Sequence, residues 1–381
     1  MITLDEFRRQ LAQRTEFHAG YPYNLDYDYT PLLPFLQYTL NNLGDPYVAS
    51  NYGIDSREFE QACLKWFAEL YELDDHWGYV NSCGTEGNLY GIFLGRELYP
   101  DGIVYSSRDT HYSIAKASRL FRIPHVIVES QDNGELNYEH LELSLRQNRH
   151  HPAIININLG TTLKGATDRI DRVLDLLEQL NIDQFHIHCD GALGGLLLPF
   201  IEDAPKISFQ KPIGSIAVSG HKFIGSPIPC GVVLTRREYV RKIEQDIEYI
   251  GSKDTTIMGS RNGLAPLFLW YAIATRGEHF REEVKACVNN AHYLYNCLGK
   301  IDYSAMLNDF STTVVLHKPD AEVCRKWQLA TQGELAHLVV MQNITVDKID
   351  LFMNDLRASL NRNISNESAN HLIQLPLKLS A

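Results

Sequence analysis

The chain has 381 residues, of which 44% are hydrophobic, and its formal net charge is −12. This length and composition suffice for a large buried core and favour one large domain with a smaller one beside it. So acidic a chain is a poor candidate for binding nucleic acid or an anionic membrane surface, and no apolar stretch approaches the ~20 residues of a membrane span.

The N-terminus and the cysteines indicate a cellular compartment. The first residues are charged and amphipathic, without the apolar run of a signal peptide. The seven cysteines are scattered and form no CxxC pair, which is typical of reduced thiols rather than of a disulfide framework or a zinc site. We therefore expect a cytoplasmic protein.

Residues 1–55 are rich in Tyr, Pro and Asn and predict an irregular arm after one short helix, which we expect to lie across a partner surface. From Ser56 onward the pattern alternates. Helical spacing is found at Phe59–Leu73, Glu86–Leu98 and Ile170–Leu180. Short, mostly β-branched runs predict buried strands at Gly78–Ser82, Ile103–Ser106, Val126–Val128, Ala153–Asn158, His186–Cys189 and Ser215–Ser219. This alternation predicts a parallel α/β sheet.

The pattern changes again after Ala265. Helices are predicted at Leu267–Ile273, Phe280–Leu298 and Asp347–Leu360, and strands at Val314–His317 and Ala336–Met341. We predict three regions: an arm (1–55), a large domain (56–265) and a small α+β C-terminal domain (266–381).

One lysine stands at the end of a predicted buried strand, in the run Ser219-Gly220-His221-Lys222. Desolvation there lowers the pKa of the amine, and an unprotonated amine can form an imine with a carbonyl cofactor. Ser219 and His221 are compact polar groups suited to a phosphate. The alternative, an ordinary surface lysine, does not explain these neighbours.

A second motif is His186-Ile187-His188-Cys189-Asp190, followed by small residues. An aspartate at this strand end could pair with the protonated nitrogen of a pyridine ring, and the small residues would let a flat ring approach. Asp190 could instead cap the next turn. A metal site built from His186, His188, Cys189 and Asp190 is the rival interpretation, although strand alternation divides those side chains between two faces.

Two further segments are weaker signals. The run from Asn81 to Asn88 contains a Gly-rich turn between a strand and a helix, where backbone N–H groups can bind phosphate; a plain glycine turn is the alternative. His111 follows a predicted strand, and its imidazole could stack on a ring or be a buried, hydrogen-bonded histidine.

Taken in order, these segments resemble the group II PLP-dependent amino acid decarboxylases of fold type I, closest to the branch that holds bacterial histidine decarboxylases and plant-type serine decarboxylases. The resemblance covers nearly the whole chain. It implies an aspartate aminotransferase-like α/β fold, with a mostly parallel seven-stranded sheet in the large domain and a small α+β C-terminal domain. It also implies pyridoxal 5′-phosphate as cofactor and a homodimer with shared active sites.

The resemblance also implies roles for individual residues. Lys222 would form the Schiff base, Asp190 would pair with the pyridine nitrogen and His111 would stack on the ring. Tyr249 would donate a proton to the substrate carbanion, in the neighbouring subunit's site; a packed tyrosine on an amphipathic helix is the alternative. The other implied cofactor contacts are Gly84, Thr85, Ser219 and His221 at the phosphate, Ala192 at the ring and Thr162 near the ring hydroxyl.

The substrate is a small L-amino acid in this interpretation. The segment Gly20–Asp26 reads like the serine branch, and Tyr23 could offer its hydroxyl to the substrate side chain or simply pack within the arm. We therefore favour L-serine, giving ethanolamine, over L-histidine, giving histamine, and rank L-alanine below both. A PLP aminotransferase is the nearest rival enzyme, and an Arg261 facing the cofactor would favour it. A catalytically silent PLP-binding protein would not need Lys222, Asp190 and His111 together.

Overall fold

The molecule is built around a seven-stranded sheet. The structure is a computed structural model that describes residues 2–373, with side chains described through Arg362. The strand order is β1 (His76–Asn81), β7 (Gly231–Arg236), β6 (Ser215–Ser219), β5 (Phe185–Asp190), β4 (Ala153–Asn158), β2 (Ile103–Ser107) and β3 (His125–Val128). All neighbours pair in parallel except β7, which runs antiparallel to both β1 and β6. The predicted mostly parallel seven-stranded sheet is confirmed.

Both faces of the sheet are covered, because successive side chains of each strand point to opposite sides. On β4, Ile154 packs with α3 (Gly84–Leu98) and α4 (Ser113–Phe121), while Ile155 belongs to the main core on the other side. That core also takes buried residues from α2 (Arg57–Leu70), α5 (Tyr138–Gln147), α6 (Ile170–Gln179) and α8 (Leu264–Arg276). The continuous apolar runs seen in the strands follow from this double burial.

Helix α3 lies unusually close to the sheet, because it carries glycine at every fourth position. A Cβ on Gly87 would lie 2.7 Å from the Cβ of Ala217, and one on Gly91 would lie 2.0 Å from Nδ1 of His188. A Cβ on Gly95 would lie 2.8 Å from a methyl group of Ile154. The missing side chains therefore bring the start of α3 down onto the carboxyl ends of β5 and β6.

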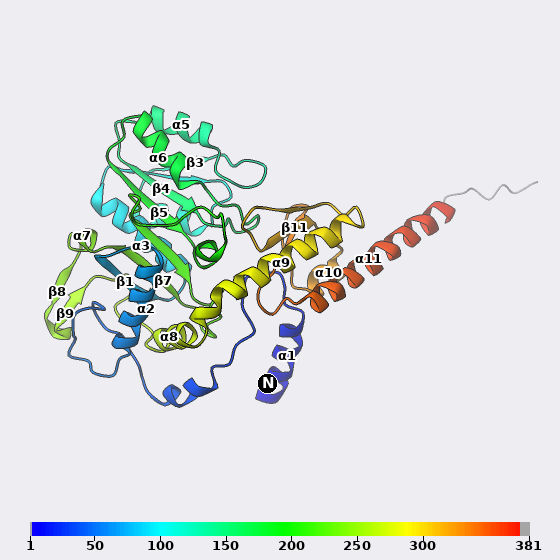
Figure 1. Cartoon of the computed structure of the whole chain (residues 1–381), viewed down its shortest axis with the longest axis horizontal. Helices are drawn as coiled ribbons and strands as arrows, with labels where there is room; N and C mark the ends of the chain where they lie inside the picture. The colour runs from blue at the N-terminus through cyan, green and yellow to red at the C-terminus, as the bar shows by residue number, and fades with distance from the viewer. Residues whose placement is uncertain (1, 374–381) are drawn as a thin grey trace, which may run out of the picture.

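A smaller C-terminal sheet is antiparallel. Its order is β10 (Ala305–Leu307), β11 (Thr313–His317), β13 (Leu335–Val339) and β12 (Ala330–Gln332). It packs with α10 (Ala321–Lys326) and α11 (Val346–Ile373), and Figure 1 shows α11 projecting from this end of the molecule. Helix α9 (Phe280–Gly299) joins both cores, since Phe280 packs in the large one and Leu294 in the small one. The three-region division stays a prediction; α8 packs in the core of the large sheet.

The N-terminal arm consists of α1 (Leu4–Glu16), an irregular stretch and the 3-10 helix η1 (Thr30–Gln37). It was expected to lie across a partner, but parts of it run along its own chain. Asn24 N donates to the Lys222 carbonyl over 3.1 Å, and Asn42 N donates to the Arg261 carbonyl over 3.1 Å. In contrast, α1 contains no buried residue.

Short elements complete the fold. The two 3-10 turns η2 (Gly194–Leu196) and η3 (Leu198–Phe200) follow β5, and η5 (Gly277–His279) joins α8 to α9. After β7 come α7 (Arg237–Val240) and a hairpin of β8 (Gln245–Ile247), η4 (Glu248–Ile250) and β9 (Ser252–Asp254). Figure 1 shows this hairpin at one edge of the large domain, near α7.

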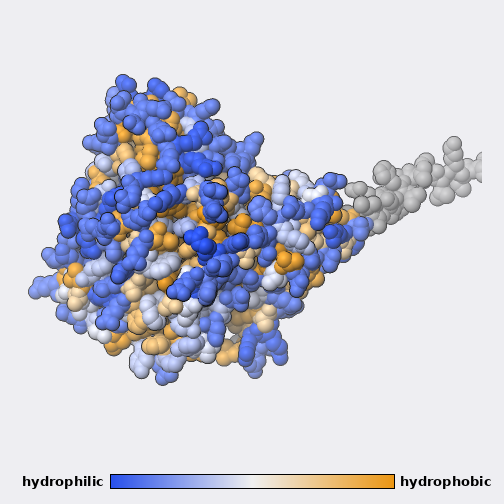
Figure 2. All heavy atoms as spheres, in the orientation of Figure 1, coloured by the Kyte–Doolittle hydropathy of each residue, from blue (hydrophilic) through white to orange (hydrophobic). Residues whose placement is uncertain are grey.

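The described part of the chain contains no helix that could cross a membrane. None of the helices between residues 2 and 373 combines the length and apolar character that crossing a bilayer requires. The face drawn in Figure 2 is largely hydrophilic, with apolar residues showing between the polar ones.

Candidate active site

Three side chains predicted from separate motifs lie together at the carboxyl ends of the parallel strands. Asp190 ends β5, Lys222 stands in the turn after β6, and His111 lies between β2 and α4. Burial lowers the pKa of the Lys222 amine, and the nearby Asp190 carboxylate opposes that shift. Burial likewise lowers the pKa of His111, with Asp190 raising it and Lys222 lowering it further. The site thus combines a carboxylate, an amine that is readily deprotonated and a neutral imidazole.

The Asp190 carboxylate is held on both oxygens. Its Oδ1 accepts the backbone N–H of Ala192 over 3.1 Å, and its Oδ2 accepts Nδ2 of Asn88 over 2.7 Å. The Lys222 amine, in contrast, makes no hydrogen bond or ion pair to any residue whose side chain the structure describes. An amine left without a partner beside an oriented carboxylate is suited to covalent chemistry.

The start of α3 faces the turn that precedes Lys222. Helix α3 begins at Gly84 without a side-chain cap, so the N–H groups of its first turn, which includes Thr85, lack that acceptor. A Cβ on Gly84 would lie 2.6 Å from Oγ of Ser219 and 3.5 Å from the Cβ of Ala192. Helix N–H groups, the helix dipole and a serine hydroxyl together form an anion-binding corner.

Comparisons with known proteins decide the family. The model of the pyridoxal-dependent decarboxylase conserved domain matches residues 55–318. The chain is 52% identical to serine decarboxylase 1 of Oryza sativa, over 92% of this chain and 74% of that one. It is 48% identical to a histidine decarboxylase of Solanum lycopersicum, over 94% of this chain and 89% of that one.

This chain belongs to the pyridoxal-dependent decarboxylases. The fold agrees, because L-methionine decarboxylase from Streptomyces sp. 590 superposes with a TM-score of 0.83 at 25% identity, covering 93% of each chain. The protein is therefore a PLP-dependent amino acid decarboxylase, and the predicted fold class, family and cofactor are confirmed.

The decarboxylase's own geometry fits pyridoxal phosphate. The uncapped start of α3 beside Ser219 offers donors to a phosphate, and the unpartnered Lys222 amine suits an aldehyde. The Asp190 carboxylate, oriented by two donors, suits a protonated ring nitrogen. These donors have the chemistry that the three parts of the cofactor require.

The N-terminal arm reaches this site through Tyr23. The ring of Tyr23 lies 5.8 Å from that of His221, which itself is oriented by a 2.8 Å contact between its Nδ1 and the Cys230 carbonyl oxygen. Tyr23 also stacks on His18 with centroids 5.6 Å apart. Burial raises the pKa of Tyr23, so its hydroxyl stays protonated at neutral pH.

Two of the predicted site residues, Thr162 and Tyr249, do not lie with Asp190, Lys222 and His111. Thr162 lies exposed in a turn after β4. Tyr249 lies in η4, at the bend of the β8–β9 hairpin, with 82% of its surface exposed. The alternative of a packed tyrosine on an amphipathic helix is wrong, because η4 is a three-residue 3-10 turn and the side chain faces solvent.

Arg261 is buried in the protein and does not face the cofactor region. Its guanidinium pairs with Glu60 and donates to the Gly44 carbonyl over 3.0 Å, and its side chain is 3% exposed. It therefore holds the arm against α2 and β1. The observation that would have favoured an aminotransferase is absent at this residue.

The rival metal interpretation has no geometric support. In the described part of the chain, no group of three His, Cys, Asp or Glu side chains could hold a metal ion. His186 and His188 instead both contact Oγ of Ser215, at 3.1 Å and 2.9 Å.

Asn88 is the last residue of the Gly-rich run, but no role was predicted for it, although it contacts Asp190 directly. The signal was available: Asn88 lies four residues after Gly84, so it is on the same face of a helix whose start points at the site. Its role depends on the close approach of α3 to β5.

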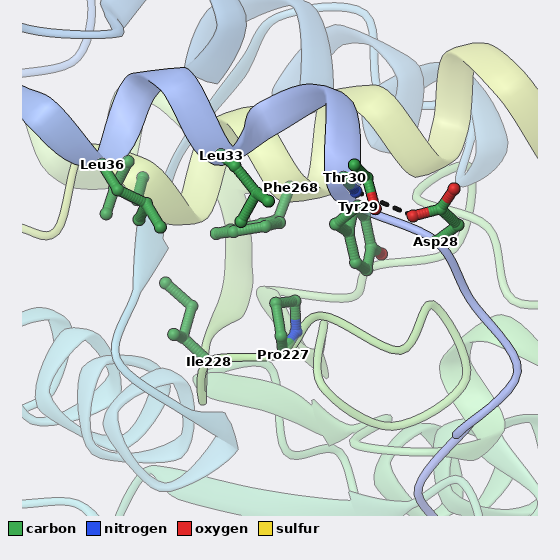
Figure 3. Close-up of a pocket in the computed structure, with 9 residues that line it drawn as sticks. Asp28, Tyr29, Thr30, Leu33, Leu36, Pro227, Ile228 and Phe268 are labelled. Carbon is green, nitrogen blue, oxygen red and sulfur yellow. Dashed lines mark hydrogen bonds between the residues drawn. The ribbon is translucent and has the colours of Figure 1, made fainter. Parts of the chain in front are cut away.

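An apolar cavity of about 380 Å³ lies beside this site rather than in it. It is lined by η1, by the start of α8 and by Pro227 and Ile228, which follow the Lys222 turn. Figure 3 shows Leu33 and Leu36 of η1 pointing toward Pro227 and Ile228. The cavity offers almost no polar group for an amino acid substrate.

Proposed function

We propose that this decarboxylase converts L-serine to ethanolamine and CO₂. The observation that carries the proposal is the 52% identity with a serine decarboxylase of Oryza sativa over 92% of this chain. The position of Tyr23 supports it, because a protonated phenol beside the Lys222 turn can bond a substrate hydroxyl. The 48% identity with a histidine decarboxylase supports histidine as the second candidate.

In this proposal, different residues of the chain bind different parts of the cofactor. Pyridoxal phosphate, when bound, supplies a conjugated ring that accepts the electrons of the bond to the departing carboxylate. Lys222 would hold the cofactor covalently, Asp190 would keep its ring nitrogen protonated and His111 would pack on the ring. Gly84, Thr85, Ser219 and His221 would bind the phosphate, and Ala192 would contact the ring face. Thr162, which is exposed in the turn after β4, would approach the ring hydroxyl.

We propose that Tyr249 donates a proton to the substrate Cα. After CO₂ leaves, the substrate Cα needs a proton, and the Tyr249 hydroxyl can deliver it and recover one from solvent. Its exposure in this chain agrees with action in the neighbouring subunit's site. Exclusion of water by that hairpin would suppress side reactions.

A homodimer is part of the proposal. Helix α1 has no buried residue, and it exposes Leu4, Phe7 and Leu11, which lie on one face at helical spacing. Exposed Leu33 and Leu36 on η1 add a second apolar area. We infer that a second copy covers these surfaces. A reducing, cytoplasmic location agrees with seven free cysteines.

The substrate is tested by product analysis. PLP-loaded protein is incubated separately with L-serine, L-histidine and L-alanine, and amine and CO₂ are measured by mass spectrometry. Ethanolamine from serine alone is expected. Tyr23→Phe should raise KM for serine, whereas Tyr27→Phe, a tyrosine of equal exposure packed on Tyr29, should not. Histamine as the main product would instead establish the second candidate.

Action of Tyr249 across subunits is tested by mixing two inactive variants. Lys222→Ala and Tyr249→Phe protomers are unfolded together and refolded to form hybrid dimers. If Tyr249 acts in the partner's site, the hybrid contains one complete site and activity returns. Mixtures as inactive as either parent would place Tyr249 in the site of its own chain or remove its role.

A further inference from the structure

The amide of Asn88 contacts three polar side chains at the site, those of Asp190, Ser113 and His188. It is 2% exposed on α3, and its Nδ2 donates both to Oδ2 of Asp190 over 2.7 Å and to Oγ of Ser113 over 2.9 Å. Its Oδ1 lies 3.0 Å from Nε2 of His188. A carboxylate only accepts hydrogen bonds, so the amide nitrogen must face Asp190 and the amide oxygen must face His188.

This orientation determines the proton positions on His111. Ser113 Oγ already accepts from Asn88, so its own hydrogen is available for Nδ1 of His111, 2.8 Å away. The backbone N–H of Ser113 also points at this nitrogen, over 3.3 Å. Nδ1 of His111 is therefore the acceptor, and the single proton of the neutral ring is on Nε2.

The same orientation determines the protons behind the site. Because Asn88 Oδ1 only accepts, Nε2 of His188 must carry its proton. Nδ1 of His188 then accepts from Ser215 Oγ over 2.9 Å, and Ser215 Oγ accepts from Nε2 of His186 over 3.1 Å. Burial lowers the pKa of His188 to about 3 and that of His186 to about 4, so both rings stay neutral. This single arrangement of protons is consistent with all the hydrogen bonds that run from Asn88 through His188 and Ser215 to His186.

We propose that Asn88 is a positioning residue that couples Asp190 to His111. It aims one oxygen of the Asp190 carboxylate and, through Ser113, keeps the His111 proton on Nε2. The inference rests on the proposed roles of Asp190 and His111 at the cofactor ring. Asn88 itself acts through these two residues and not on the substrate.

The test compares Asn88→Ala with Asn156→Ala. Asn156 is equally buried on β4, but its amide donates to Asn158 and not to Asp190. For each variant, the affinity of the apoenzyme for pyridoxal phosphate is titrated by absorbance, and the visible band of the loaded enzyme is followed against pH. Asn88→Ala should weaken cofactor binding roughly tenfold to hundredfold, the range for losing a hydrogen bond to a charged group. Asn156→Ala should stay within threefold of wild type.

A second variant covers the case in which Asn88→Ala does not fold. Ser113→Ala is nearly isosteric; it removes the hydroxyl that links Asn88 to His111 and leaves the bond from Asn88 to Asp190 in place. It should therefore shift the pH titration of the visible band while leaving the thermal midpoint of the apoenzyme nearly unchanged. An unchanged titration curve in Ser113→Ala would overturn the His111 branch.

Asp190→Ala separates this inference from the proposed function. If Asp190→Ala binds pyridoxal phosphate weakly and Asn88→Ala binds it like wild type, the role of Asn88 is refuted and that of Asp190 stands. If Asp190→Ala also binds like wild type, the assignment of Asp190 fails, and the role of Asn88 fails with it.

Discussion

Replacing Arg261 by methionine should destabilise the protein without altering substrate affinity. The change leaves the Glu60 carboxylate, which has no exposed surface, without its countercharge. It also leaves the Gly44 carbonyl without a donor. Breaking a buried ion pair from one side costs about 3–5 kcal/mol. Glu60 retains two neutral donors at 2.8 Å, the N–H of Val80 and Nδ2 of Asn42, so we expect about 3 kcal/mol, the lower end of that range.

The assay is denaturant unfolding at one protein and cofactor concentration, together with KM for the substrate at 25 °C. Arg146→Met is the control, because Arg146 pairs with Glu142 at the surface, with side chains 61% and 38% exposed, and should cost at most about 0.5 kcal/mol. The double variant Glu60→Gln/Arg261→Met should recover most of the loss. A tenfold rise in KM with unchanged unfolding free energy would refute this reasoning and show that Arg261 binds the substrate carboxylate.

Three further outcomes follow from the same structure. After borohydride reduction, the mass spectrum of Lys222→Ala should show the protein without covalently bound cofactor, whereas that of Lys211→Ala should show the protein with it. A covalent adduct in Lys222→Ala would show that another amine holds the cofactor. Gly91→Ala should lower the thermal midpoint, because its Cβ would lie 2.0 Å from the buried His188 ring. Gly299→Ala, whose Cβ meets nothing within 4 Å, should not lower it, and equal midpoints for the two variants would contradict the close packing of α3. Burial lowers the pKa of His188 to about 3 in the folded protein, whereas an unfolded histidine has a pKa of ~6.5. As the pH falls below ~6.5, the unfolded chain therefore binds a proton at this residue that the folded protein does not bind. Stability should therefore drop by about 1.4 kcal/mol per pH unit from this histidine, and His188→Gln should show a correspondingly shallower loss between pH 6 and 5.

Much of the large domain could be predicted from local pattern. The strands at Ala153–Asn158 and Ser215–Ser219 begin and end at the predicted residues. Short apolar, β-branched runs bounded by turn residues form buried strands in most proteins. Strand β7 was not predicted, although Gly231–Arg236 is an apolar run of the same kind. It pairs antiparallel with β6, the strand directly before it, and with β1, which is more than 150 residues earlier in the chain, so its place between the two depends on a long-range contact.

The arm shows a different limit. Composition indicated a segment that does not pack on itself, but it could not distinguish docking on a partner from docking on the same chain. The structure shows both kinds of surface: Asn24 is bonded to the Lys222 turn, while α1 remains uncovered. That choice depends on long-range contacts, which carry no local signature.

The alternation of strands and helices, the family, and the three side chains that lie together at the carboxyl ends of the strands could all be predicted from the sequence. The three side chains could be predicted because parallel strands present their carboxyl ends at one edge, so residues that follow different strands converge there. The pairing of Arg261 with Glu60, the exposure of Tyr249 and the bonds that link Asn88 to Asp190 and, through Ser113, to His111 could be seen only in the folded chain. The contacts of Arg261 and Asn88 depend on the distance between elements far apart in the chain, and for Asn88 that distance depends on glycines allowing α3 to approach β5.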